Sequence, residues 1–156
     1  MKYVILILSF IFILSGCERN NQQPQNQTHQ TESEEESDNR NLHTITIDGV
    51  PLKVEIAQDA ETRTHGLMYR EDMARDEGML FVFSEQRILS FWMRNTFIPL
   101  DIAFINNKGI IVDIQRMEPL DESKQYISTA PALYALEVNA GWFEDYGIQV
   151  GDVVAF

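Results

Sequence analysis

The chain is poor in cysteine, because Cys17 is the only one among its 156 residues. A single cysteine cannot form a disulfide within the chain. No cysteine follows it, so thiol catalysis and cysteine-built zinc sites are excluded from residues 42–156. His43 and His65 lack partners at HxxxH or HxH spacing, and glycine-rich phosphate motifs such as GxGxxG are absent. We therefore expect no metal and no cofactor.

Positive charge is also scarce. The chain has 12 Lys and Arg against 24 Asp and Glu, a net charge of −12. Residues 18–41 carry six acidic and two basic side chains (−4), residues 42–156 carry 18 and nine (−9), and Lys2 completes the total. Nucleic acids require a positive surface on their partners. A nucleic-acid partner is therefore not expected, and the acidity predicts a solvated surface.

No apolar run is long enough to span a bilayer. The longest near the start, Tyr3–Leu14, has twelve residues interrupted only by Ser9, whereas a spanning helix needs about 20. It follows the basic Lys2 and suits the apolar core of a signal peptide. We expect residues 1–16 to be such a peptide.

The end of this run, Leu14-Ser15-Gly16-Cys17, resembles the lipobox of bacterial lipoproteins. The resemblance implies that Cys17 receives a diacylglyceryl group and becomes the first residue after cleavage. The alternative is an ordinary signal peptide with a chance cysteine. One acyl chain holds a protein only weakly, so a lasting anchor requires two or more. We therefore expect a lipid-anchored protein on the extracytoplasmic face of the cell membrane, with the bilayer as a partner.

A polar segment follows the lipidation site. Residues 18–41 are rich in Asn, Gln, Ser, Thr and Glu, and they contain no aromatic or aliphatic side chain. Such a composition cannot bury enough apolar surface to offset the entropy lost on ordering. We interpret residues 17–41 as the lipidated cysteine and a disordered tether.

The remaining residues, 42–156, show the periodicity of β-strands. Alternating or continuous apolar runs predict strands around Ile45–Ile47, Leu52–Ile56, Met79–Phe83, Ile88–Met93, Ile102–Ile105, Ile110–Ile114, Tyr134–Val138 and Val153–Phe156. Asp48-Gly49 and Asn106–Gly109 are hairpin turns by their composition. Met79–Phe83 is apolar throughout, which predicts burial on both faces.

Helical signals are fewer. Asp59 is a suitable cap for a helix from Ala60 to about Tyr69 or Met73, in which Gly66 implies close packing. Ala140–Tyr146 is a candidate short helix. We therefore expect a mainly β protein, a compact antiparallel sandwich or barrel-like domain with one packed helix over residues 42–156.

Five separated motifs in this region resemble the family called domain of unknown function 192. They are Gly66-Leu67-Met68 with Arg70, Gly78-Met79-Leu80-Phe81, Phe91-Trp92-Met93 with Asn95-Thr96, Pro99-Leu100-Asp101, and Leu136-Glu137-Val138-Asn139 with Gly141. The resemblance covers nearly all of residues 42–156. It implies a compact β-sandwich or barrel-like fold with a packed helix, and it implies no particular activity.

Two carboxylates lie in or beside apolar strands, Asp101 and Glu137. An unpaired charge there is unfavourable. In one interpretation, these carboxylates form ion pairs or hydrogen bonds with Arg70, Arg94 or backbone N–H groups. In the other, they share a ligand pocket with an arginine for an anionic or hydroxyl-rich ligand and an aromatic stacking face. The candidate ligand-binding residues are Arg70, Trp92, Arg94, Asn95, Asp101 and Glu137.

Two functions remain open. The first is a non-enzymatic binding module at the cell envelope for a small ligand, a glycan or a protein partner. The second is a hydrolase or lyase that uses Asp101 and Glu137 as a carboxylate pair. Glycosidase chemistry requires the two carboxyl groups to lie about 5–9.5 Å apart across an open cleft.

Overall fold

The computed structural model describes residues 40–156. The predicted signal peptide, lipidation site and most of the tether lie outside them. Within the described part, no helix is both long and apolar enough to cross a membrane. The described residues, 40–156, form one compact unit.

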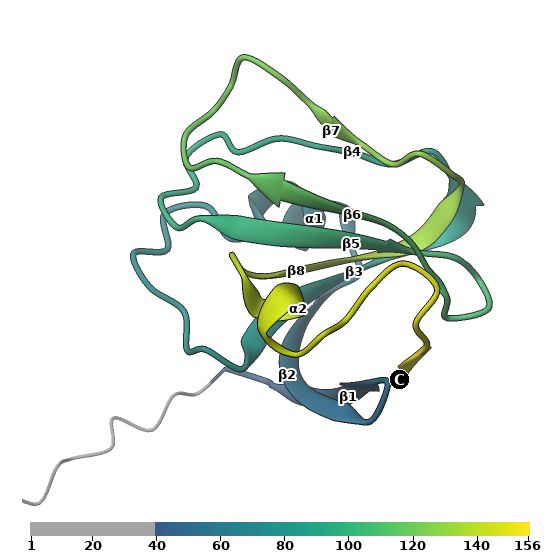
Figure 1. Cartoon of the computed structure of the whole chain (residues 1–156). Helices are drawn as coiled ribbons and strands as arrows, with labels where there is room; N and C mark the ends of the chain where they lie inside the picture. Colours follow the sequence, from purple (N-terminus) through teal and green to yellow (C-terminus); the bar gives the residue numbers. More distant parts are fainter. Residues whose placement is uncertain (1–39) are drawn as a thin grey trace, which may run out of the picture. The chain divides into compact units, whose positions relative to one another are not determined.

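The unit is a seven-stranded mixed sheet, with a small two-stranded sheet and two short helices (Figure 1). The strands are β1 (His43–Ile47), β2 (Val50–Ala57), β3 (Glu77–Arg87), β4 (Ser90–Phe91), β5 (Leu100–Ile105), β6 (Ile111–Met117), β7 (Tyr126–Ile127), β8 (Ala132–Asn139) and β9 (Val154–Ala155). The helices are α1 (Ala60–His65) and α2 (Trp142–Asp145). The large sheet runs β6-β5-β8-β3-β2-β1-β9, and β4 pairs with β7. The mainly β class is confirmed.

Both predicted hairpins are present. Asp48 and Gly49 take positive φ angles of 47° and 86°, as a tight turn between twisted strands requires, and β1 pairs with β2. The turn after β5 is held by the Asn106 side chain, which accepts hydrogen bonds from the N–H groups of Lys108 and Ile110. Local turn chemistry therefore determines these two strand pairs.

Separate apolar clusters cover the two faces of the central strands. One contains β1, β2 and α2 side chains such as Ile47 and Trp142. The other contains side chains beneath α1 and the β4–β7 pair, among them Phe81 and Phe91. Figure 1 shows α2 in front of the sheet and α1 behind it. Every residue of β5 is buried, since a strand covered on both faces has no solvent side.

The sheet is not wholly antiparallel, which corrects the expected architecture. β2 and β3 run parallel, with Glu55 opposite Met79. Parallel neighbours need a crossover of about a dozen residues or more, and the segment that contains α1 provides it. The predicted crossover helix thus makes the parallel pair possible.

Two predicted elements are shorter than expected. Asp59 caps α1 through a capping box with Thr62, as predicted, but the helix ends at His65 rather than near Tyr69 or Met73. Gly66 ends it with φ 51° and ψ −133°, a conformation open essentially to glycine alone. The predicted buried strand Ile88–Met93 is also wrong, because only the two residues of β4 pair there, and Trp92 is 46% exposed.

Candidate functional site

A pocket of about 250 Å³ opens beneath α1, on the face of the sheet that the β4–β7 pair covers. It is lined by Ala60, Arg63, Thr64, His65, Gly66, Leu67, Met68, Phe81, Phe83, Ser90, Phe91, Trp92, Thr96 and Glu137. These residues come from α1 and its following turn, β3, the β4 region and β8. Four of the five motifs that carried the family resemblance contribute to the lining, the first and third with three residues each and the second and fifth with one each.

Glu137 lies on β8, between Met79 of β3 and Ile102 of β5 in the strand register. Its side chain is 5% exposed and borders the pocket. Within residues 40–156, no hydrogen bond or ion pair joins its carboxyl group to another residue. Burial away from water raises the pKa of Glu137 to about 8. The group is therefore largely protonated at neutral pH.

Most other polar groups in the lining already donate to protein oxygens. Arg63 donates to the carbonyls of Gln58 and Val82, Thr64 to that of Ala60, Thr96 to that of Arg94, and Ser90 to the Gln125 amide oxygen. Among the lining side chains, this leaves the Glu137 carboxyl, the His65 imidazole and the Trp92 indole N–H without a described hydrogen bond. A ligand would find these three groups available.

Two glycines shape the pocket from opposite sides. A Cβ on Gly66 would lie 3.4 Å from the Phe81 ring, so the glycine brings the turn after α1 down onto that ring. A Cβ on Gly78 would lie 2.5 Å from the Glu137 carbonyl oxygen. Glycine there allows β3 and β8 to pair closely where Glu137 enters the pocket.

Aromatic side chains form the walls and rim. The Phe81 and Phe91 rings meet edge to face, with centroids 5.0 Å apart. Trp92 lines the opening, and the Arg94 guanidinium lies 5.7 Å from its ring centroid. These rings offer flat apolar faces to a ligand.

Of the six residues predicted to bind a ligand, the structure brings Trp92 and Glu137 into this pocket. Arg94 stacks on Trp92 from outside the lining. The Asn95 amide donates to the Tyr69 hydroxyl at 2.8 Å, and the Tyr69 N–H donates to the Asn95 carbonyl at 2.7 Å. Asn95 thus ties together the segments that follow α1 and β4.

Arg70 does not face this pocket. Its guanidinium binds Glu55 through two hydrogen bonds, of 2.7 and 3.0 Å. Burial opposes ionisation of Glu55, but Arg70 and Arg40 outweigh it and hold the Glu55 pKa below its ordinary value. This ion pair joins the turn after α1 to β2. It occupies both terminal nitrogens of the Arg70 guanidinium, which are then not available to bind a ligand.

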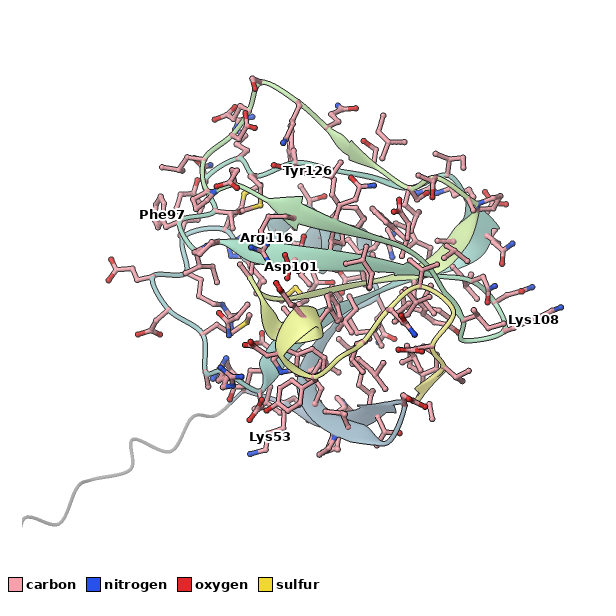
Figure 2. The ribbon with its side chains drawn as sticks, in the orientation of Figure 1. Lys53, Phe97, Asp101, Lys108, Arg116 and Tyr126 are labelled. Atoms are coloured by element: carbon pink, nitrogen blue, oxygen red, sulfur yellow. The ribbon has the colours of Figure 1, made fainter. Side chains whose placement is uncertain are left out.

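Asp101 faces the other side of the sheet. Glu137 is directly opposite Ile102, and neighbouring residues of a strand point to opposite faces, so Asp101 points away from the pocket. Its carboxylate accepts from the Arg116 guanidinium at 2.5 and 3.2 Å and from the Gly141 N–H at 2.7 Å (Figure 2). The structure therefore does not bring Asp101 and Glu137 together as a carboxylate pair.

The sequence reasoning did not single out several lining residues, notably Arg63, His65, Phe81, Phe83, Phe91 and Thr96. His65 was considered above only as a metal ligand, for which it lacks a partner at the right spacing. The available signal for a site role was that His65 directly precedes Gly66, the first residue of the first family-like motif. In the described part of the chain, no group of three His, Cys, Asp or Glu side chains is arranged to hold a metal ion.

The pocket has the chemistry of a binding site. A protonated carboxyl group can donate one hydrogen bond and accept others, and an ionised one can pair with a cation. The surrounding rings exclude water and supply stacking surfaces. The pocket contains no serine–histidine or cysteine nucleophile arrangement among the hydrogen bonds of residues 40–156.

The same part of the chain matches a known protein family. Residues 43–156 match the model of the DUF192 family, described as "Uncharacterized ACR". No curated protein matches the chain.

Two solved structures are similar to it. A candidate transcription regulator from Sinorhizobium meliloti 1021 is 44% identical, with a TM-score of 0.65 over 67% of this chain and 81% of its own. A protein of unknown function from Novosphingobium aromaticivorans DSM 12444 is 32% identical, with a TM-score of 0.70 over 74% and 85%. With the family match over residues 43–156, these likenesses show that the chain belongs to the DUF192 family.

Proposed function

We propose that the folded domain is a binding module that takes a small ligand into the pocket above Glu137 and performs no reaction on it. One observation carries the proposal: a buried carboxyl group with no described protein partner borders a surface-open, aromatic-walled pocket. Buried polar groups are normally hydrogen-bonded within the protein. The Glu137 carboxyl is therefore available to hydrogen-bond a ligand in this pocket.

The pocket volume limits the size of the ligand. At about 250 Å³ it is smaller than the roughly 300–1,000 Å³ of typical drug-sized sites. A small metabolite fits this description, and so does the end residue of a glycan or peptide. Trp92, 46% exposed at the opening, would contact the part of such a ligand that extends outward.

A thermal-shift screen tests this function. We expect at least one compound in a panel of sugars, amino acids, amines and short peptides to raise the melting temperature of the domain. The increase should disappear in Trp92→Ala, which removes part of the pocket rim. Phe97→Ala is the matched control, because Phe97 is equally exposed and lies outside the lining (Figure 2).

Two results would contradict the proposal. One is the absence of stabilisation by any member of the panel. The other is an equal response of both variants to a compound that does stabilise the wild type. Either would show that the pocket is not where ligands act.

We also propose that this domain is held at the extracytoplasmic face of the cell membrane by lipid on Cys17. The support is the sequence alone: a basic start, an apolar run too short to span, and a lipobox-like end. A polar stretch of 24 residues, 18–41, then separates the anchor from the domain. As a flexible coil it would allow roughly 25–30 Å between the two.

A further inference from the structure

The strand residues on either side of Glu137 are apolar. Its cross-strand neighbours are Met79 and Ile102, and Phe81 lies in the same lining. An isolated carboxylate in such surroundings is strongly disfavoured, which is why burial alone accounts for its raised pKa. A positive charge brought beside it would favour the ionised form in a region where water screens poorly.

Few charged groups face Glu137 from the elements packed against it. Arg63 and His65 reach the pocket from α1, and β3 contributes Glu77, diagonal to Glu137 on the same face. The Glu77 carboxylate lies 2.8 Å from the Arg40 guanidinium. Burial is the only cause that shifts the Glu137 pKa, so none of these charges sets it. The position for a counter-ion is therefore left to a ligand.

The aromatic walls suit the same kind of ligand. Cations are attracted to the faces of aromatic rings. The domain already shows this with its own side chains, since Arg63 and Arg87 lie 5.2 and 5.3 Å from the Phe83 ring centroid. The net charge of −9 over residues 42–156 also favours the approach of a cation.

From this geometry we infer the chemical class of the ligand. We propose that it is a small organic ammonium compound, whose cationic head binds Glu137 and whose apolar body packs on the Phe81, Phe91 and Trp92 rings. This rests on the binding function proposed above. On binding, the Glu137 carboxyl releases its proton to solvent, while the ammonium group keeps its own. The pair is then one anion and one cation inside the pocket.

Calorimetric titration with 2-phenylethylamine and its neutral isostere 2-phenylethanol tests the inference. The amine remains protonated from about pH 6 to pH 8, since simple alkylamines titrate near pH 10. Because binding releases a proton, we expect its affinity to rise about ninefold from pH 6 to pH 7 and about fivefold from pH 7 to pH 8, where half of the Glu137 carboxyl groups are already ionised. Titrations in buffers of different ionisation enthalpy should show proton release at pH 6. The alcohol should bind at least tenfold more weakly at pH 8.

The variant Glu137→Gln keeps the shape and removes the charge. We expect it to lose the pH dependence and at least tenfold of the amine affinity at pH 8. Glu85→Gln, an exposed position on β3, is the matched control and should behave as the wild type. If Glu137→Gln fails to fold, the pH dependence of the amine affinity of the wild type still tests the inference.

The possible failures are distinct. If the alcohol binds as well as the amine, with an affinity independent of pH below 8, the ligand is a neutral hydrogen-bonding compound. The ammonium inference is then wrong, while the pocket remains a binding site. If neither probe binds and the wider panel gives no stabilisation, the proposed function itself is wrong.

Discussion

At the scale of single residues, two buried carboxyl groups differ in whether they have hydrogen-bond partners within the protein. Asp101 accepts three hydrogen bonds, from Arg116 and the Gly141 N–H, and it is held on one face of the sheet. Glu137 accepts none within the described chain and lies on the other face. The first is a structural ion pair. The second retains its hydrogen-bonding capacity, which is what a binding site requires.

Glu137 should make the stability of the domain depend on pH. Below about pH 4.5, its ordinary pKa, the group is protonated in both folded and unfolded chains. Between that pH and about 8, only the unfolded chain loses the proton, so folding becomes less favourable by about 1.4 kcal/mol per pH unit. We therefore expect Glu137→Gln to stabilise the domain by an amount that grows from near zero at pH 4.5 to several kcal/mol at pH 8.

Chemical denaturation of the variant and the wild type across this range measures the difference. Glu85→Gln serves again as the control, because its carboxyl group is exposed. The control should show no such growth with pH. A constant difference between Glu137→Gln and the wild type would mean that the carboxyl group is not neutral in the folded domain.

At the scale of elements, the pocket exists because α1 ends early. Six helical residues span only about 9 Å, and Gly66 then turns the chain down onto Phe81. The Asp59 capping box supports the start of the helix, where a short element has the fewest internal hydrogen bonds. A helix continued to Tyr69 would not place the turn after His65 over the aromatic ring.

Gly66→Ala should therefore reduce both stability and ligand binding. We expect a loss of about 1–3 kcal/mol from the strained backbone and, because relief of that strain moves the turn over Phe81, a smaller ligand-induced shift in melting temperature. Gly49→Ala is the matched control, since Gly49 also has a positive φ but has open space around its Cβ position. The control should lose stability and keep the ligand response. An undiminished response in Gly66→Ala would contradict this role.

At the scale of the whole molecule, an acidic domain with a proposed ligand pocket is combined with a proposed lipid anchor. Both parts depend on moving apolar groups out of water, in the core of the sheet and, in our proposal, in the bilayer. An intervening polar stretch would let the pocket sample the space above the membrane surface.

Cys17→Ala tests the anchor. Because the proposed anchor is the lipid on Cys17, we expect the variant to leave the membrane fraction of cells that express the full chain. Immunoblotting of membrane and soluble fractions measures the distribution, and Ser15→Ala, which keeps the cysteine, is the control. Retention of Cys17→Ala in the membrane fraction would show that something other than the lipid anchors the protein.

The sequence by itself determined the class of the fold and most of its strands. The Asp48-Gly49 turn, the Asp59 cap and the apolar runs of β3, β5 and β8 act locally, so residue type and spacing were enough to place them. The family match followed from the same motifs. Trp92 and Glu137, two of the six candidate ligand-binding residues, line one pocket in the structure.

Only the tertiary structure decided how the charged groups are partnered. Arg116 takes Asp101 because β5 and β6 pair with these two residues opposite each other. Arg70 pairs with Glu55 because the turn after α1 returns to β2. The position of α1 over the sheet likewise brings His65 to the pocket. These partners are separated in the sequence by 15 residues or more, so no local pattern records them. Strand register and the path of the chain bring them together, and the same register places Glu137 at the pocket without a described partner.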